Sequence, residues 1–195
     1  MDAKSGSAID WETIARGILD YATPFEIPTS VEVVPNQFVL NRRTNLTGTL
    51  KIASSTTIGA NAFENCKITG VIFPSNLVTI NSNAFSSTEL TGEIEFPNSL
   101  VTIGNNSFQV CKKITSIVIG SAVTTIKNFA FFNCDHLDTV VCNATTPPTM
   151  PANVFQGCTA LANIYVPDAS VSTYQSASGW STYASIIKPI SQRPT

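Results

Sequence analysis

The chain repeats one pattern of apolar and polar residues. From residue 57 onward it reads TIGANAFENCKITGVIFP, TINSNAFSSTELTGEIEFP, TIGNNSFQVCKKITSIVIG and TIKNFAFFNCDHLDTVVCN, followed by the partial copy PANVFQGCTALANIYVP. The phenylalanines of the five copies, which are Phe63, Phe85, Phe108, Phe131 and Phe155, are separated by 22, 23, 23 and 24 residues. A period of about 20 to 30 residues is typical of a solenoid with one short strand per coil. Because a unit this small does not bury its own apolar face, neighbouring copies must stack around a shared core.

Each copy contains a short segment in which two apolar residues flank a variable one. These segments, at 71–73, 94–96, 117–119, 140–142 and 164–166, follow the two-residue period of a β-strand. The outer members are therefore expected to point inward and the middle ones outward. Stacked copies then form a parallel sheet with strands about 4.8 Å apart. A second short strand is predicted at 77–80 and its equivalents, with the repeated phenylalanines on the opposite wall.

An asparagine precedes most of the repeated phenylalanines by two positions. The column contains Asn36, Asn61, Asn83, Asn106 and Asn153, with Phe129 as the exception. An asparagine side chain can bond turn backbone that lacks a strand partner. We therefore interpret this column as structural.

Both ends of the array are predicted to be capped. A short helix beginning at Asp10 places Trp11, Ile14, Ile18 and Leu19 on one face, where they cover the first coil. After residue 167 the repeat stops, and Asp168 or Ser170 is predicted to cap a second helix. The chain thus divides into an N-terminal tail and helical cap (1–24), an array of about six coils with a degenerate first coil and an insert at 40–45 (25–167), and a C-terminal cap and tail (168–195).

The repeated motif IxxxAFxxCxxLxxIxIPxxL is similar to the BspA-type leucine-rich repeat, and the resemblance covers residues 25–167 approximately. It implies a mainly β, curved repeat solenoid with short parallel strands, an N-terminal helical cap and a C-terminal helix-plus-strand cap. It also implies a role in adhesion or recognition on bacterial surfaces, in phage-associated proteins or in parasitic protists, and no enzyme activity. This chain departs from the motif at residues 86–88, which replace a cysteine, and at Gly120, which replaces a proline.

Composition excludes several classes of partner. Charged residues make up only 12% of the chain, its net charge is −2 and its pI is near 5.3. Such a chain has no basic field for phosphate, which argues against nucleic-acid binding. No apolar run of about 18 residues occurs, so no membrane insertion is expected.

The N-terminus does not resemble a signal peptide, because residues 1–6 are polar and no apolar core follows. Two interpretations stay open. Either the protein remains where it is made, or the sequence begins after a removed leader and the protein is secreted or placed on the cell surface. A phage virion is the alternative location.

The candidate chemical groups do not form a reactive set. Cys66, Cys111, Cys134 and Cys158 share one repeat column, and Cys142 occupies an inward strand position. Buried reduced thiols are the favoured interpretation, with a disulfide between stacked neighbours such as Cys111 and Cys134 as the alternative. No CxxC pair occurs, and His136, the only histidine, is expected in solvent, so neither a metal site nor a catalytic triad is predicted. No phosphate-binding or dinucleotide motif occurs, so no cofactor is expected.

Two outward rows are the candidate partner-binding face. The first is the middle column of the strand segments, and the second is a row of threonines whose stacked hydroxyls suit a flat β-face. The residues are Lys51, Ile72, Glu95, Val118, Val141 and Tyr165 in the first row, and Thr57, Thr79, Thr102 and Thr125 in the second.

Two functional hypotheses remain. The leading one is a noncatalytic adhesion module that presents this strand face to a protein or glycan partner. The alternative is a structural or decoration subunit of a phage virion or surface fibre. The protein is accordingly expected to be a monomer or a subunit of a larger assembly.

Overall fold

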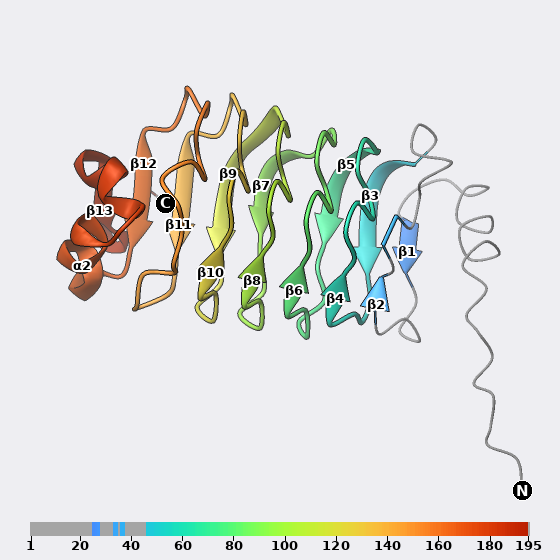
Figure 1. The fold of residues 1–195 in the computed structure, drawn as a ribbon, viewed down its shortest axis with the longest axis horizontal. Coiled ribbons are helices and arrows are strands. Elements are labelled where there is room, and N and C mark those ends of the chain that lie inside the picture. The colour runs from blue at the N-terminus through green and yellow to red at the C-terminus, as the bar shows by residue number, and fades with distance from the viewer. Residues whose placement is uncertain (1–24, 28–32, 35, 38–45, 195) are drawn as a thin grey trace, which may run out of the picture.

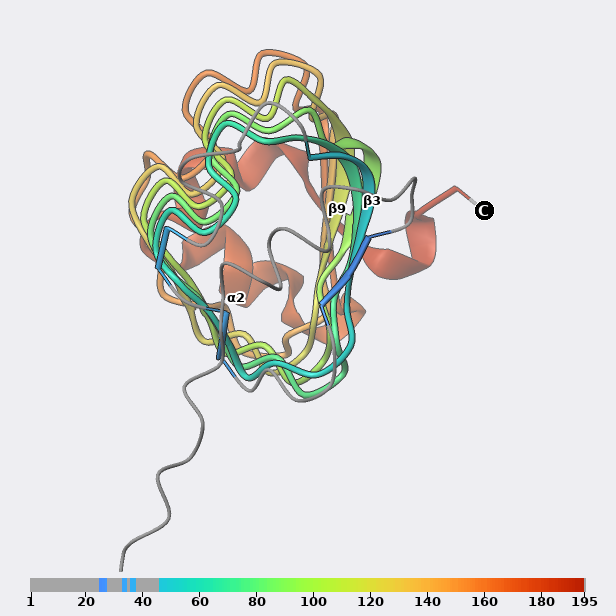
Figure 2. The same cartoon turned by 90° about the vertical axis from the view of Figure 1, so that its right-hand side faces the viewer.

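The repeated segments stack as consecutive rungs of a solenoid in this computed structural model (Figure 1). The structure describes residues 25–27, 33–34, 36–37 and 46–194. Each repeat contributes one strand to a long-strand wall, and the repeats up to β10 also contribute one two-residue strand to a short-strand wall. Along the array the rungs superpose as nested outlines (Figure 2). The predicted N-terminal helical cap and the insert at 40–45 lie outside the described residues.

The long-strand wall consists of parallel strands in two separate sheets. One sheet contains β1 (Phe25–Ile27), β3 (Thr47–Ile52) and β5 (Lys67–Ile72). The other contains β7 (Thr91–Glu95), β9 (Lys113–Ile119), β11 (Thr139–Cys142), β12 (Asn163–Val166) and β13 (Ile187–Pro189). Between β5 and β7 the wall is joined by a hydrogen bond from Thr91 Oγ1 to Thr69 O, 3.1 Å, and by stacking of Phe73 on Phe96, with ring centroids 5.6 Å apart. The predicted wall is thus parallel but interrupted once.

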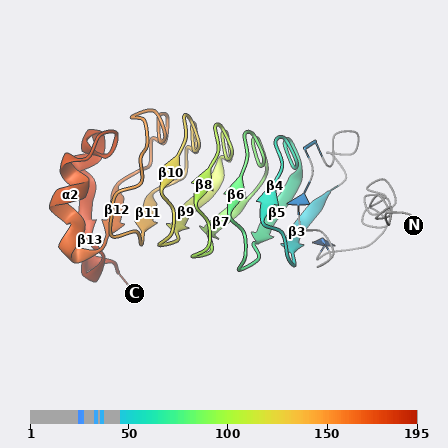
Figure 3. The same ribbon diagram turned by 60° about the horizontal axis from the view of Figure 1, so that its bottom comes forward.

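The short-strand wall is one parallel sheet of five strands, which lie side by side in Figure 3. Its strands are β2 (Val33–Val34), β4 (Thr57–Ile58), β6 (Thr79–Ile80), β8 (Thr102–Ile103) and β10 (Thr125–Ile126). In the last four strands threonine is paired with threonine and isoleucine with isoleucine in register. A parallel bridge from Thr125 to Thr149 extends the pairing toward the C-terminal cap.

The repeated phenylalanines form a single interior file, which confirms the predicted packing. Successive ring centroids of Phe63, Phe85, Phe108, Phe131 and Phe155 are 5.2, 5.1, 5.4 and 5.7 Å apart, and each pair is stacked. All five rings are at most 2% exposed. The small residues before them, such as Ala62 and Ala84, are also buried, so backbone and ring fit within one rung spacing.

The asparagine column has a more specific role than the sequence indicated. Asn61, Asn83 and Asn106 have φ values of 58°, 56° and 53°. This left-handed conformation is costly for most residues but tolerated by asparagine. Side-chain bonding to turn backbone, the predicted role, occurs at Asn36, whose Oδ1 accepts from Ala60 N at 2.7 Å. The column therefore mainly allows a sharp bend ahead of each ring.

None of the five cysteines forms a disulfide and all five are buried, as the favoured interpretation predicted. In three consecutive rungs the thiol donates to the carbonyl oxygen of the phenylalanine in the preceding rung. These bonds join Cys111 to Phe85, Cys134 to Phe108 and Cys158 to Phe131, at 3.1, 3.2 and 3.0 Å. In the copy that lacks a cysteine, Thr88 Oγ1 donates to Phe85 O at 3.0 Å. A small side chain with one donor is what this position requires.

Helical turns and β13 close the C-terminal end of the array. The elements are the 3₁₀ helix η1 (Asp168–Ser170), α2 (Val171–Ser176), the 3₁₀ helix η2 (Trp180–Ile186), β13 and the 3₁₀ helix η3 (Ile190–Gln192). Trp180 is fully buried and its Nε1 donates to Pro148 O at 2.7 Å. The capping prediction is wrong in detail: Ser170 precedes α2 without a side-chain cap bond, because its Oγ donates to Thr145 O at 2.8 Å.

Replacing Phe108 by alanine should be strongly destabilising. The ring is completely buried and lies between Phe85 and Phe131, with Phe96 edge-to-face at 5.3 Å. We expect the free energy of unfolding to fall by about 3 to 5 kcal/mol, measured by urea denaturation. The half-buried Phe132 is a matched control, and its alanine variant should lose less than half as much. Equal losses would contradict the interior file as the main source of stability.

Stability should decline at high pH because of Cys111. Burial raises the pKa of this thiol from 9.0 to about 11. Between these values the unfolded chain releases the proton while the folded chain retains it, so the folded state loses relative stability as pH rises. We expect a decrease of about 2 to 3 kcal/mol between pH 9 and 11, measured by urea denaturation at each pH. A Cys111→Ala variant should show a smaller decrease, and an identical pH dependence would refute this origin.

Candidate functional site

The outer face of the long-strand wall is the first predicted surface. Lys51, Ile72 and Glu95 are exposed, and Ile72 exposes 53% of its surface. Val118 is half-buried. In the C-terminal sheet, one register row runs through Glu95, Val118, Val141, Tyr165 and Lys188. The N-terminal part of the predicted row is therefore open to solvent.

The expectation that Val141 and Tyr165 face solvent is wrong. They are only 1% and 5% exposed, yet neither belongs to the interior core that contains their strand neighbours Val140 and Ile164. Their side chains leave the strands on the outer side, where the C-terminal segment after β13 lies. Figures 1 and 2 show that this segment turns back outside the long-strand wall. The outer face is thus partly covered by the chain itself.

Two polar contacts hold the C-terminal segment (residues 190–194) against this face. Arg193 forms an ion pair with Glu93 on β7, with 2.8 Å between the guanidinium nitrogen and Oε2. Ser191 N donates to Asp168 Oδ1 at 3.1 Å, and this interaction lowers the pKa of Asp168. Because β13 and β7 are the two edge strands of one sheet, the segment must cross β12, β11 and β9 to reach Glu93. That path explains why Val141 and Tyr165 are covered.

The threonine row, which is the second row of the predicted face, lies on the short-strand wall. Thr57, Thr79, Thr102 and Thr125 are each half-buried and paired in register. Val33, 48% exposed, continues the row on β2. The two predicted rows therefore lie on different walls of the solenoid, and a single flat partner does not contact both.

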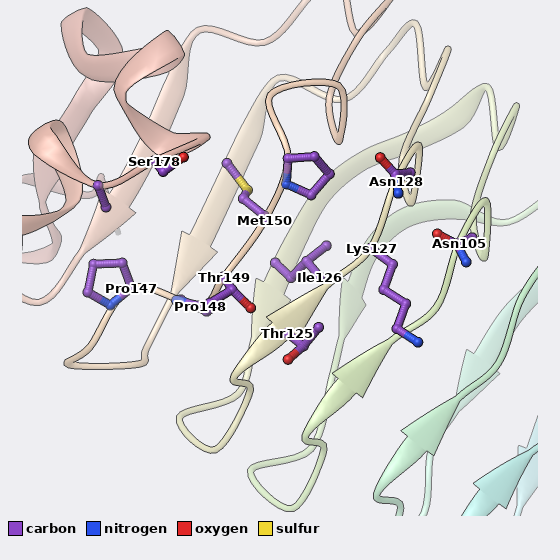
Figure 4. A pocket seen from close by; sticks show the side chains of 12 residues that line it. Asn105, Thr125, Ile126, Lys127, Asn128, Pro147, Pro148, Thr149, Met150 and Ser178 are labelled. Atoms are coloured by element: carbon purple, nitrogen blue, oxygen red, sulfur yellow. The ribbon is translucent and has the colours of Figure 1, made fainter.

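A groove of about 710 Å³ opens where the threonine row meets the C-terminal cap (Figure 4). Thr125 and Lys127 line one side, and Met150, Ala177 and Ser178 line the other. The remaining lining residues are Asn105, Ile126, Asn128, Pro147, Pro148, Thr149 and Pro151. Sequence reasoning missed this groove, because the cap residues that form its wall lie about 50 residues from Thr125 in the chain.

The groove is shaped by backbone contacts rather than by reactive groups. Ile126 N donates to Thr149 O, and Thr149 N donates to Thr124 O, both at 2.9 Å. From the C-terminal cap, Trp180 Nε1 donates a hydrogen bond to Pro148 O. These bonds fix residues 148–149 at the end of the sheet. The groove therefore combines apolar proline and methionine surfaces with hydroxyl, amide and one ammonium group.

The described residues do not gather a reactive or metal-binding set. No group of three or more His, Cys, Asp or Glu residues within this part of the chain is arranged to hold a metal ion. His136 is exposed. Burial raises the pKa of Cys142. The hydrogen bond between Cys134 and Cys158 raises the pKa of Cys134 and lowers the pKa of Cys158. No helix among the described residues has the length and apolarity needed to cross a bilayer.

Comparisons with known proteins agree on the repeat. The family model of the BspA type leucine rich repeat region matches residues 56–181 with six copies. A leucine-rich repeat protein of T. pallidum is similar in structure, with a TM-score of 0.56 and 23% identity over 73% of this chain and 71% of that one. A leucine rich cell surface protein of Faecalibacterium prausnitzii A2-165 is also similar, with a TM-score of 0.46 and 23% identity over 84% of this chain and 34% of that one. No curated protein matches the chain.

Removing the C-terminal segment should expose Val141 and Tyr165 on the outer face of the long-strand wall. In a chain ending at Pro189, Val141 and Tyr165 lose their cover, so we expect increased binding of an apolar fluorescent dye and faster hydrogen exchange in β11 and β12. Arg193→Ala alone removes only an exposed ion pair, which is worth about 0 to 1 kcal/mol, and should change both signals little. Unchanged dye binding by the shortened chain would show that other residues bury Val141 and Tyr165.

Proposed function

Because the chain belongs to the BspA-type leucine-rich repeat family, we propose that it is a noncatalytic interaction module that binds a protein partner. Repeat solenoids commonly bind other proteins on their extended surfaces. The observation that carries the proposal is the groove of about 710 Å³ at the end of the threonine row. Its volume lies within the range of about 300 to 1,000 Å³ that is typical of binding pockets.

The short-strand wall supplies a surface that suits a flat partner. Its five strands, spaced about 4.8 Å apart, span roughly 20 Å. The row from Thr57 to Thr125 presents half-buried methyl and hydroxyl groups in register. A partner that lies along this row gains apolar contact without having to desolvate charges, because all four residues are neutral threonines.

The groove supplies specificity at one end of that surface. A side chain of the partner enters between Thr125 and Ser178 and contacts Met150 and the neighbouring prolines. Lys127, exposed at the rim, favours an acidic group beside that side chain. A central anchor with a polar rim is the usual arrangement of protein interfaces.

The open part of the long-strand face provides a second contact region in this proposal. Lys51, Ile72 and Glu95 are exposed there, and the exposed isoleucine is the apolar centre of the region. Val118, Val141 and Tyr165 become available only when the C-terminal segment moves. The two regions lie on different walls, so they serve different partners or different parts of one partner.

The proposal includes the organisation and location predicted from the sequence. Residues 1–24 and 168–195 serve as caps and tails of the array at 25–167, and the protein acts at a cell surface or after secretion. The alternative, a structural or decoration subunit of a phage virion or surface fibre, is favoured by no contact among the described residues. Within this proposal the protein acts as a monomer or as a subunit of a larger assembly.

The experiment uses two variants of the groove. Thr125→Glu adds a charge to the row, and Ser178→Trp fills the groove from an exposed position. The wild-type chain and both variants are tested against a panel of purified cell-surface and extracellular-matrix proteins by biolayer interferometry. We expect at least one protein to bind the wild type, and each variant to weaken that binding at least tenfold.

Thr47→Glu is the matched control, because Thr47 is an exposed strand residue on the other wall and pairs with Lys67. It should leave binding unchanged, and melting curves should show that all variants are folded. Binding that survives both groove variants would remove the groove from the proposal. A wild-type chain that binds no member of the panel but co-purifies with virion proteins would favour the structural alternative.

A further inference from the structure

Equivalent positions in the other copies show which residue suits each bend of the array. Asn61, Asn83 and Asn106 occupy equivalent positions and adopt φ values of 53° to 58°. The fourth copy places Phe129 there, with φ of 57°. A bulky side chain in this left-handed region is strained, whereas asparagine is one of the few residues that tolerates it. Stability alone would therefore keep asparagine at position 129, as in the other three copies.

Phe129 is also exposed, unlike the phenylalanines of the interior file. It exposes 36% of its surface, whereas the repeated phenylalanines are at most 2% exposed. Its ring contacts Phe132 edge-to-face, with centroids 5.4 Å apart and an angle of 84° between the planes. Two aromatic rings on the outside of one bend are thus held in a fixed mutual geometry.

Phe132 is equally unusual within the repeat. Neighbouring rungs place Gln109 and Gln156 at the equivalent position, and both are polar and at least partly exposed. Aromatic substitution therefore occurs at two positions of the same copy, and the two substituted residues contact each other. Strained, exposed residues that do not serve the fold are often functional.

The bends around the aromatic pair are polar, and Lys127, which is exposed and lies two residues before Phe129, is the charged residue nearest to it in the chain. None of the residues at 105–110, 128–133 and 152–157, which form the bends of three successive rungs, is acidic or basic. The rungs are directly adjacent, since Asn106 N donates to Asn128 O and Asn133 N donates to Gln156 O, at 3.0 and 2.9 Å. The adjacent bends therefore bring amide-bearing residues to both sides of the copy that contains the two rings, and each amide can both donate and accept hydrogen bonds.

We propose that Phe129 and Phe132 form a platform that binds a neutral saccharide. A sugar ring has an apolar C–H face that suits an aromatic ring and a rim of hydroxyl groups that suits amides. Apart from Lys127, these bends offer no charged side chain, so a ligand that carries several charges, such as a nucleic acid or a highly acidic glycan, finds few partners here. Amide side chains of the neighbouring bends, among them those of Asn106, Gln109 and Gln156, supply the polar contacts.

This site is distinct from the protein-binding groove, although the two are neighbours. Asn128 lines the groove and directly precedes Phe129. The site does not depend on the proposed protein partner, since neither aromatic ring lines the groove. Its failure and that of the proposed function can therefore be observed separately.

The repeat itself supplies the test variants. Phe129→Asn and Phe132→Gln restore the residues that other copies have at these positions. The wild-type chain and both variants are applied to an array of neutral and acidic oligosaccharides, and hits are quantified by titration calorimetry. We expect the wild type to bind at least one neutral oligosaccharide, and each variant to bind it at least tenfold more weakly. Phe129→Asn should at the same time raise the melting temperature, because it relieves the strained conformation.

Val78→Asn is the control for loss of an exposed apolar side chain, because Val78 exposes 40% of its surface away from this bend. It should retain saccharide binding. Unchanged binding by Phe129→Asn, or binding only to acidic oligosaccharides, would overturn the proposal. A lowered melting temperature of Phe129→Asn would refute the strain argument. Binding that depends on Phe129 but only to proteins of the panel would show that the aromatic pair is a protein contact.

Discussion

The structure depends on stacking identical side chains at the spacing of parallel strands. The interior rings are 5.1 to 5.7 Å apart, close to the strand separation of about 4.8 Å, so each ring contacts the next while the backbones remain paired. This constraint leaves little room between rungs. A Cβ atom added at Gly104 would lie 2.6 Å from the backbone of Asn81, and one at Gly120 would collide with the backbone of Pro97. At Gly120, where this chain departs from the repeat motif, the close packing leaves no room for a side chain.

The same constraint explains which positions are free to vary. Inward positions must match the rung above and below, so the phenylalanine file and the thiol or hydroxyl beside it are nearly uniform. Bend positions have only to satisfy the backbone conformation. Val110, with φ of 59°, and Phe129 depart from the asparagine, serine or glycine found at equivalent bends, and both depart at an energetic cost. In a repetitive chain, such differences between copies carry more functional information than the shared motif.

Much of the fold could be predicted because its signals are local and repeated. The period, the inward phenylalanines and the buried thiols were all evident from one column of residues each. The covering of Val141 and Tyr165 could not be predicted, because Arg193 and Glu93 are 100 residues apart and no pattern links them. The groove was missed for the same reason. The left-handed backbone at Phe129 could not be predicted from the sequence, because it becomes evident only from the backbone geometry of the equivalent asparagines.

The final strand, β13, has a consequence for the whole array. The strand ends at Pro189, which has no amide hydrogen to offer another strand, and α2 packs against β13. Open strand edges invite further chains to add, and a stacked array would otherwise grow end to end into fibres. Because β13 and α2 alone close this end of the array, coils can be gained or lost upstream during evolution without leaving an open strand edge here. Array length is thereby uncoupled from solubility at this end of the molecule.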